Sequence, residues 1–477
     1  MSRLDRFVDA VRSLVHLFPA ALARLGLVEA HRGEETTDLA LPRIVTGLAR
    51  QSQRTVDLIM IGAAVGPAGI AGLALAAPFW GIAGGLGSGI TNGAVGLISQ
   101  RYGAEEYGRM NLAIKQTLLL TLLLTLPLGV GFVVFAERLI GLFGVDPAST
   151  RYGVTYLRVV STAVVVTCLN KVATRTLVSA GDAWIEMVVR VTGSLVNIAL
   201  NVVFIFGLGM GVFGAALGTV LAKAFVLGIF SAGFLRGRFP GIGAFPTRLS
   251  PTPEFDAGLF RQLVEVSAPL IVRQLAQRFA RFPLLAIVAN FGTVVVAAYG
   301  ISRRIYFLLR TPNWGLSLAA SSLVGQRLGA DEEREAAAYG WDIIRFAAVV
   351  YLLGATAAFV FAHALTRLFT TDPATVAATV PFVRVIAVGT VLMGLDGVAT
   401  GILRAGGDTR WPMYGRFVGL YLLTLPVAYL AVVTPLGVVA LYAALLSEAL
   451  VPALVSCYRF TTGRWLEISR SYRPSSG

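Results

Sequence analysis

Residues 112–136 read LAIKQTLLLTLLLTLPLGVGFVVFA, an apolar run with a single lysine near its start. A helix needs about 20 such residues to cross the hydrocarbon core of a bilayer. Similar runs recur along the whole chain of 477 residues, of which 56% are hydrophobic and only 14% are charged. Soluble domains carry about 25% charged residues. The composition therefore predicts an all-α polytopic membrane protein and argues against a soluble enzyme.

The apolar runs divide the chain into twelve expected transmembrane helices. They cover residues 41–65, 68–99, 112–136, 152–178, 187–206, 212–234, 263–291, 295–324, 338–363, 376–403, 414–433 and 437–458. Arginines crowd the alternate connections and the C-terminal tail, and cytoplasmic loops are the ones enriched in basic residues. This bias predicts a multi-pass protein of the cell membrane with both termini in the cytoplasm. The net charge of +14 then reflects loops beside anionic lipid, with no nucleic-acid partner.

The chain contains an internal repeat. Leu142–Ala148 (LFGVDPA) matches Leu368–Ala374 (LFTTDPA), and Gln100–Ala104 (QRYGA) matches Gln326–Ala330 (QRLGA), both at an offset of 226 residues. Each copy contains six spans, so both copies enter the membrane in the same direction. The repeat predicts two six-helix bundles related by a pseudo-twofold axis along the membrane normal, which is an architecture of secondary transporters.

The same pattern gives expected domain limits. We expect an N-terminal amphipathic extension on the membrane surface at residues 1–38, bundles at 39–234 and 261–460, a cytoplasmic linker at 235–260 and a cytoplasmic tail at 461–477. The extension is assigned to the surface because its apolar residues follow helical spacing between frequent charges. The linker is rich in proline, glycine and arginine.

Acidic residues within the spans are candidates for function, because an ionised carboxylate in a bilayer costs several kcal/mol unless it is paired or hydrated. Asp57 in the first span is predicted to bind the coupling ion, and the alternative is an ion pair with Arg54. Asp396 in the tenth span and its repeat mate Asn170 are predicted to line a substrate cavity. The alternative for Asp396 is a carboxylate satisfied by helix neighbours or by Arg404.

Other unusual residues lie within the spans. Glu448 is a weaker candidate of the same kind as Asp396. The seventh and eighth spans contain a basic set made of Arg273, Arg278, Arg281, Arg303, Arg304 and Arg310. These arginines either extend to the cytoplasmic interface or face the cavity and favour an anionic or amphipathic substrate. Glycines at 81, 85, 89 and 93 in the second span indicate close helix packing, with a hinge as the alternative.

Three motifs resemble those of the multidrug and toxic compound extrusion (MATE) family, in its prokaryotic, archaeal DinF-like form. They are TVDLIMIG at Thr55–Gly62, LISQRYGAEEY at Leu97–Tyr107 and LRAGGDTR at Leu403–Arg410. They occur in the family's order, and the resemblance covers about residues 41–459. It implies a secondary antiporter that exports organic cations, drugs or metabolites by alternating access in exchange for H⁺ or Na⁺, with no other cofactor.

The resemblance also implies partners for Asp57. Asn197 matches the fifth-span asparagine of the family and Thr219 matches its sixth-span threonine. Asn201 stands where related members carry an aspartate, which removes one negative charge and weakens the attraction for a cation. With Asp57, these residues form the expected cation-coupling set and a candidate Na⁺ site.

Two other functions are weighed against antiport. A flippase for lipid-linked oligosaccharides or amphipathic lipids, from the same wider superfamily, is favoured by the arginines of the seventh and eighth spans. A membrane-embedded enzyme would need an acid, a base or a nucleophile converging at one membrane face, and the sequence shows no such set. It also has no Walker A or HExxH motif, so transport must use an ion gradient or run downhill. The expected partners are therefore a small molecule, an organic cation by resemblance, and the lipid bilayer, with the protein acting as a monomer.

Overall fold

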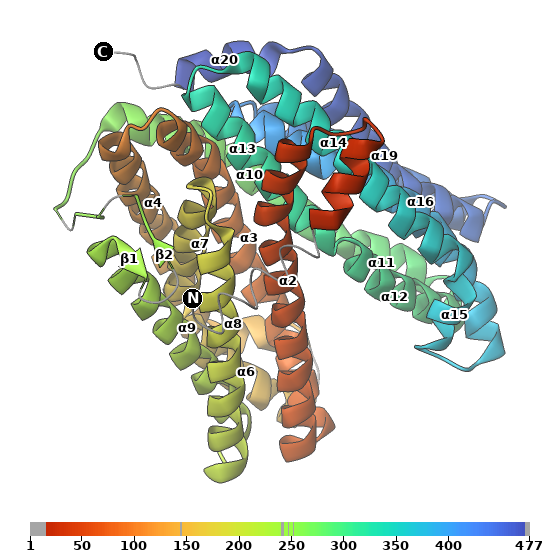
Figure 1. The fold of residues 1–477 in the computed structure, drawn as a ribbon. Coiled ribbons are helices and arrows are strands. Elements are labelled where there is room, and N and C mark those ends of the chain that lie inside the picture. Colours follow the sequence, from red (N-terminus) through yellow and green to blue (C-terminus); the bar gives the residue numbers. More distant parts are fainter. Residues whose placement is uncertain (1–15, 144–145, 240–242, 247, 251, 473–477) are drawn as a thin grey trace. The chain divides into compact units, whose positions relative to one another are not determined.

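The computed structural model describes residues 16–143, 146–239, 243–246, 248–250 and 252–472 (Figure 1). These residues are almost entirely helical, and the prediction of an all-α polytopic membrane protein is confirmed. The first half contains helices α2 (Ala30–Val65), α3 (Pro67–Gly103), α4 (Tyr107–Val134), α5 (Ala136–Gly141), α6 (Pro147–Ser161), α7 (Val164–Ser179), α8 (Ala183–Asn201), the π-helical segment η1 (Val202–Gly207) and α9 (Gly211–Arg236). A short antiparallel hairpin of β1 (Arg238–Phe239) and β2 (Gly243–Ala244) follows.

The second half repeats this helical pattern. It contains α10 (Ala257–Phe279), α11 (Arg281–Ala289), α12 (Gly292–Leu309), α13 (Thr311–Gly329), α14 (Glu333–Val360), α15 (Ala362–Arg367), α16 (Pro373–Ala405), α17 (Arg410–Phe417), the π-helical segment η2 (Val418–Thr424), α18 (Leu425–Val433), α19 (Val438–Thr461) and α20 (Arg464–Tyr472). Residues 16–24 are also helical, whereas residues 1–15 of the predicted amphipathic extension lie outside the described residues.

Within the described residues, eight helices are long and apolar enough to cross a membrane, or nine if α6 and α7, bent by 50°, form one span. These correspond to nine of the twelve expected spans. The other three, at 41–65, 263–291 and 295–324, are also helical. The last two are each interrupted, near Ala280 and Arg310, and all three contain charged residues. The charges were already evident in the sequence, whereas the breaks in the last two segments are seen only in the structure.

The chain forms two compact units. One contains residues up to Ile44, Ser99–Glu105 and the chain from Val272 onward, and we call it the C-terminal unit. The other contains Val45–Ile98 and Glu106–Ile271, and we call it the N-terminal unit. Helix α2 runs without interruption through the boundary expected between residues 38 and 39 and passes from one unit into the other. The other expected domain limits stay predictions.

Backbone conformation confirms that the two halves repeat. Glycines with positive φ occur in four pairs, each separated by 226 residues: Gly66 and Gly292, Gly181 and Gly407, Gly211 and Gly437, and Gly237 and Gly463. Glycine adopts this left-handed conformation without steric penalty. The same offset relates Glu105 and Asp331, two non-glycine residues with positive φ that follow α3 and α13. Equivalent turns are therefore built at equivalent positions.

The repeated Asp-Pro motif begins a helix in each half. Asp146 is the N-cap of α6 and accepts a hydrogen bond from the Ser149 N–H at 2.9 Å. Its counterpart Asp372 caps α16 and accepts from the Thr375 N–H at 2.8 Å. These hydrogen bonds, together with the hydroxyls of Ser149 and Thr375, lower the pKa of both aspartates below its ordinary value. The proline that follows suits the first turn of a helix.

The two copies of the QR-x-GA motif pack against each other within the C-terminal unit. A Cβ added at Gly103 would overlap the backbone carbonyl of Gln326, and one added at Gly329 would overlap that of Gln100. Each glycine therefore faces the glutamine of the other copy. Such a reciprocal contact is the signature of twofold symmetry, so the repeat also sets how these two segments pack.

The glycine stripe of α3 packs against α10 within the N-terminal unit. An added Cβ would lie 2.7 Å from the Ile271 Cα if placed on Gly89, and 2.8 Å from the Ser267 Cα if placed on Gly93. The Ser267 hydroxyl donates to the Ile90 carbonyl across the same contact, at 3.2 Å. These distances support the packing interpretation of the stripe.

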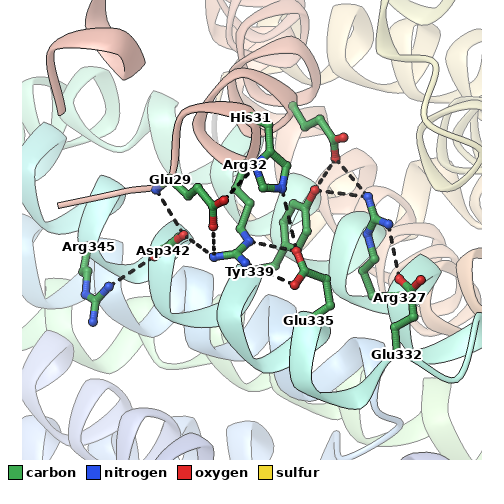
Figure 2. A network of polar contacts seen from close by, with 10 residues as sticks. Glu29, His31, Arg32, Arg327, Glu332, Glu335, Tyr339, Asp342 and Arg345 are labelled. Atoms are coloured by element: carbon green, nitrogen blue, oxygen red, sulfur yellow. Dashed lines mark hydrogen bonds and ion pairs between the residues drawn. The ribbon is translucent and has the colours of Figure 1, made fainter. Parts of the chain in front are cut away.

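A polar network joins the start of α2 to α14 within the C-terminal unit (Figure 2). Arg32 donates to both carboxylate oxygens of Glu335, at 3.0 and 3.1 Å, and to Asp342 at 3.0 Å. The Tyr339 hydroxyl, which lies between them on α14, donates to Glu35 at 2.7 Å. A bidentate arginine–carboxylate contact is strong and geometrically specific. The first turns of α2 are thus held against α14.

Candidate functional site

Three helices of the N-terminal unit bring the predicted coupling residues together. Helix α2 supplies Asp57, α8 supplies Asn197 and Asn201 one turn apart, and α9 supplies Thr219. The Asn201 Nδ2 donates to the Asp57 Oδ1 at 2.7 Å and to the Asn197 Oδ1 at 3.4 Å. The Asn197 Nδ2 donates to the Thr219 hydroxyl at 3.4 Å. The four residues expected from the resemblance therefore form one hydrogen-bonded cluster.

The cluster is buried except at its acid. Asn197 and Asn201 are almost completely buried, Thr219 is buried, and Asp57 is half-buried. The Asn201 Oδ1 is buried and accepts no hydrogen bond within the described part of the chain. A buried acceptor without a donor costs about 1–3 kcal/mol. Because this oxygen belongs to a residue that contacts the Asp57 carboxylate, the two residues offer the oxygen ligands that hard cations prefer.

One member of the cluster was missed in the sequence. Gln53 lies one turn before Asp57 on α2, and its Nε2 lies 2.7 Å from the Asn197 Oδ1. Rotating the Asn197 amide instead lets its Nδ2 donate to the Asp57 Oδ1 at 3.2 Å and its oxygen accept from the Thr219 N–H at 3.2 Å. In either orientation Asn197 links α2 to α9. The spacing of four residues between Gln53 and Asp57 was the available signal, because it places both on one helical face.

Arg54 was the alternative partner of Asp57. Its side chain lies outside the described residues, so the proposed Arg54–Asp57 ion pair stays a prediction. In the described ranges no three His, Cys, Asp or Glu side chains gather in a way that could hold a metal ion. Among the described side chains, the Asp57 carboxylate contacts the amide groups of Asn201 and, in the rotated orientation, of Asn197.

Gly218 on α9 makes room for Asn201, and this contact gives a prediction. A Cβ at Gly218 would overlap the Asn201 Oδ1. We expect Gly218→Ala to displace the Asn201 amide from Asp57 and to raise about tenfold the ion concentration needed for half-maximal transport. Transport by the variant reconstituted in liposomes, measured against ion concentration, tests this.

The matched control is Gly228→Ala on the same helix, where an added Cβ meets nothing within 4 Å. It should leave the ion dependence unchanged. Equal behaviour of the two variants would show that the position of Asn201 does not matter for ion binding.

Asp396 lies in the C-terminal unit and is fully engaged. Its Oδ2 accepts from Arg273 and from Arg416, both at 2.8 Å, and its Oδ1 accepts from Ser456 at 2.9 Å and Thr400 at 3.2 Å. Two guanidinium groups already compensate its charge. The surroundings therefore do not favour the predicted attraction of a cationic substrate by Asp396, and they support the alternative of a satisfied carboxylate.

The alternative partners considered for Asp396 were helix neighbours or Arg404, and the helix neighbour Thr400 is the one that contacts it, at 3.2 Å. Arg404 instead donates to the Ser321 hydroxyl at 3.1 Å and to the Ser317 carbonyl at 3.0 Å, which joins α16 to α13. Sequence spacing suggested Arg404 because it lies two turns away on the same helix. The actual partners Arg273 and Arg416 come from α10 and α17, and only tertiary packing could reveal them.

The remaining candidates have local partners. Glu448 accepts from Arg303 at 3.0 Å, and the Arg303 guanidinium also lies over the Tyr306 ring. Arg304 is exposed, and the Arg281 side chain lies outside the described residues.

In the N-terminal unit, the buried Asn170 Nδ2 donates to the Lys223 carbonyl at 2.9 Å. A cavity shared by Asn170 and Asp396 stays a prediction, because the two residues belong to different units.

Comparison with known proteins agrees with this architecture. The chain is 29% identical to the probable multidrug resistance protein NorM of Bradyrhizobium diazoefficiens over 432 residues, which cover 86% of this chain and 88% of the relative. It is 22% identical to the probable multidrug resistance protein YoeA of Bacillus subtilis over 397 residues, which cover 82% of this chain and 84% of the relative.

Solved structures share the fold. A crystal structure of MATE in the bent conformation matches with a TM-score of 0.83 at 22% identity, covering 92% of this chain and 97% of that one. A variant of the Vibrio cholerae MATE transporter VcmN matches with a TM-score of 0.82 at 17% identity, covering 94% and 98%. The MatE family model matches residues 42–203 and 269–430, one segment in each half of the repeat. Because these segments make up well over half of the chain, this protein is a member of the MatE family of multidrug and toxic compound extrusion transporters.

Proposed function

We propose that this transporter exports small organic molecules in exchange for H⁺ or Na⁺, and that the coupling ion binds at Asp57. The observation that carries the proposal is the cluster of Asp57 with Asn197, Asn201 and Thr219. It contains a half-buried carboxylate in a segment that was expected to span the membrane, and intramembrane acids are functional by default. The relatives NorM and YoeA are named as probable multidrug resistance proteins, which supports export of small molecules.

The buried Asn201 oxygen supports Na⁺, in preference to a proton, as the coupling ion. It lacks a hydrogen-bond donor within the described residues. Carboxylate and amide oxygens are the ligands that a hard cation such as Na⁺ takes, whereas a proton would be held by Asp57 alone. Since Asn201 carries no charge, Asp57 is the one acid among these four residues.

Helix α2 gives the ion a way to influence the rest of the chain. Its residues up to Ile44 belong to the C-terminal unit and its residues from Val45 to the N-terminal unit. Pro42 lies just before this transition and removes one helical hydrogen bond. We propose that ion binding changes the hydrogen bonds of α2 with α8 and α9, and that α2 bends near Pro42. A bound ion can drive such a change only by binding two conformations with different affinity.

Ion-driven transport in liposomes tests the proposal. We expect export of ethidium or of carboxyfluorescein to follow an imposed proton or sodium gradient, and Asp57→Asn to lose this dependence because its amide cannot carry the charge that binds the cation. The fluorescence of each probe under each gradient is the measurement. Because one probe is a cation and the other an anion, the dependence of transport on the ion gradient can be tested without assuming the charge of the substrate.

The matched control is Asp38→Asn, which removes an acid of the same helix that contacts His16. This variant should keep gradient-driven transport. If Asp57→Asn transports as well as the wild type under both gradients, the coupling ion binds elsewhere and the proposal is wrong.

A further inference from the structure

The interior of the C-terminal unit contains more positive than negative charge. Arg273 and Arg416 both donate to the single carboxylate of Asp396, each at 2.8 Å. One carboxylate can neutralise only one of them. Because Ser456 and Thr400 also donate to Asp396, this acid has no capacity for a further cationic partner.

Arg416 is not fully satisfied by its contacts. Its side chain is 8% exposed. Besides Asp396 it donates to the Glu448 carbonyl at 3.3 Å, and its Nε is buried with no acceptor within the described residues. A buried guanidinium N–H without an acceptor costs more than a neutral group in the same position. Arg416 therefore has a donor that no described acceptor satisfies.

Arg404 is buried without an acidic partner in the described part of the chain. It is 5% exposed, and its two hydrogen bonds go to neutral oxygens of Ser321 and Ser317. It also lies close enough to Arg273 for their charges to repel, as does Arg310. Arg273, Arg404 and Arg416 against Asp396 alone give a net charge of +2, and Arg310 adds a further positive charge.

The other buried acids of this unit do not offset the excess. Glu448 is paired with Arg303 at 3.0 Å, Asp408 with Arg459 at 2.5 Å and Asp342 with Arg32 at 3.0 Å. An uncompensated buried charge is strongly destabilising, so the cluster requires an anion that the described side chains do not supply. Arg273 keeps 14% of its side chain exposed.

We propose that Arg273, Arg404 and Arg416 bind the phosphate or carboxylate group of a free organic anion that the transporter carries. Guanidinium groups bind such groups through paired N–H donors, which gives both affinity and orientation. The inference rests on the proposed function, because it names the substrate class of that transporter. The substrate is then an organic anion or zwitterion, in contrast to the organic cation implied by resemblance.

The test is binding to the purified full-length protein, measured by titration calorimetry with phenyl phosphate and benzylammonium. These two probes share an aromatic ring and differ in the sign of their charge. We expect phenyl phosphate to bind at least tenfold more tightly to the wild type. Equal affinity for the two probes would overturn the proposal without any variant.

Arg404 is the residue to change, because Arg273 and Arg416 also hold Asp396. We expect Arg404→Gln to weaken phenyl phosphate binding at least tenfold, a change of about 1.4 kcal/mol, and Arg404→Lys to retain part of it. Arg384→Gln is the matched control, since Arg384 is an exposed arginine of the same helix. Unchanged binding in Arg404→Gln would contradict the proposal.

Two further binding measurements identify the source of the anionic group. Inorganic phosphate that binds as tightly as phenyl phosphate would show a site for a free inorganic ion and would overturn the organic class. Loss of phenyl phosphate binding in nanodiscs of phosphatidylglycerol, but not of phosphatidylcholine, would assign the site to a lipid headgroup and would also overturn it. The proposed coupling is tested separately, because Asp57→Asn should lose gradient-driven transport and keep phenyl phosphate binding.

Discussion

Gly329→Val should strongly destabilise the protein. The Cβ of the new side chain would overlap the backbone carbonyl of Gln100, and backbone cannot move aside as a flexible side chain can. Overpacking of this kind costs about 3 kcal/mol, and the two additional methyl groups of valine increase the strain. We expect a lower yield of folded protein and a lower melting temperature in detergent. Gly103→Val should have a similar effect, because Gly103 meets Gln326 in the reciprocal way.

The control for this pair is Gly354→Ala in α14, where an added Cβ meets nothing within 4 Å. Replacing a helical glycine by alanine where there is space stabilises by about 0.4–1 kcal/mol. The melting temperature of this variant should therefore equal or exceed that of the wild type. Normal stability of Gly329→Val would show that the two copies of the motif do not pack closely.

Asp396→Asn should also strongly lower the stability of the protein. The substitution removes the only carboxylate that Arg273 and Arg416 share, and an amide can accept hydrogen bonds but cannot neutralise a guanidinium. Removing one partner of a buried ion pair costs about 3–5 kcal/mol because the other charge stays buried and uncompensated. The melting temperature measured in detergent should fall accordingly. Phenyl phosphate should raise it more in this variant than in the wild type, since the anion can replace the lost charge.

A surface pair provides the comparison. Arg158 and Glu137 lie 2.8 Å apart, with 46% and 70% of their side chains exposed. Exposed pairs contribute about 0–1 kcal/mol, so Glu137→Gln should leave the melting temperature almost unchanged. An equally small effect of Asp396→Asn would mean that the charge balance described for the C-terminal unit is incorrect.

The coupling cluster shows how far the sequence could be taken. Asp57 was identified from its position in an apolar span, and its partners Asn197 and Thr219 came from a family resemblance. The structure places all three in one hydrogen-bonded cluster. Gln53 was missed because its spacing of four residues from Asp57, which places both on one face of α2, was not followed up.

The basic cluster shows where the sequence was insufficient. Arg273 and Asp396 are 123 residues apart along the chain, and Arg303 and Glu448 are 145 apart. No spacing rule links residues at such distances. The sequence therefore listed unusual arginines and acids within the spans, but for Asp396 it could offer only a cavity role or local partners, namely helix neighbours or Arg404.

By itself the sequence determined the membrane-spanning character of this protein, its helical class and its internal repeat. These properties follow from composition, from the length of apolar runs and from the constant offset between repeated motifs. All three can be read along the chain without knowing which helices pack together. Only the tertiary structure decided which buried charges meet, because ion pairs in a bundle depend on how separate helices pack. It also decided that the QR-x-GA motifs face each other, since that contact depends on glycines that lie 226 residues apart.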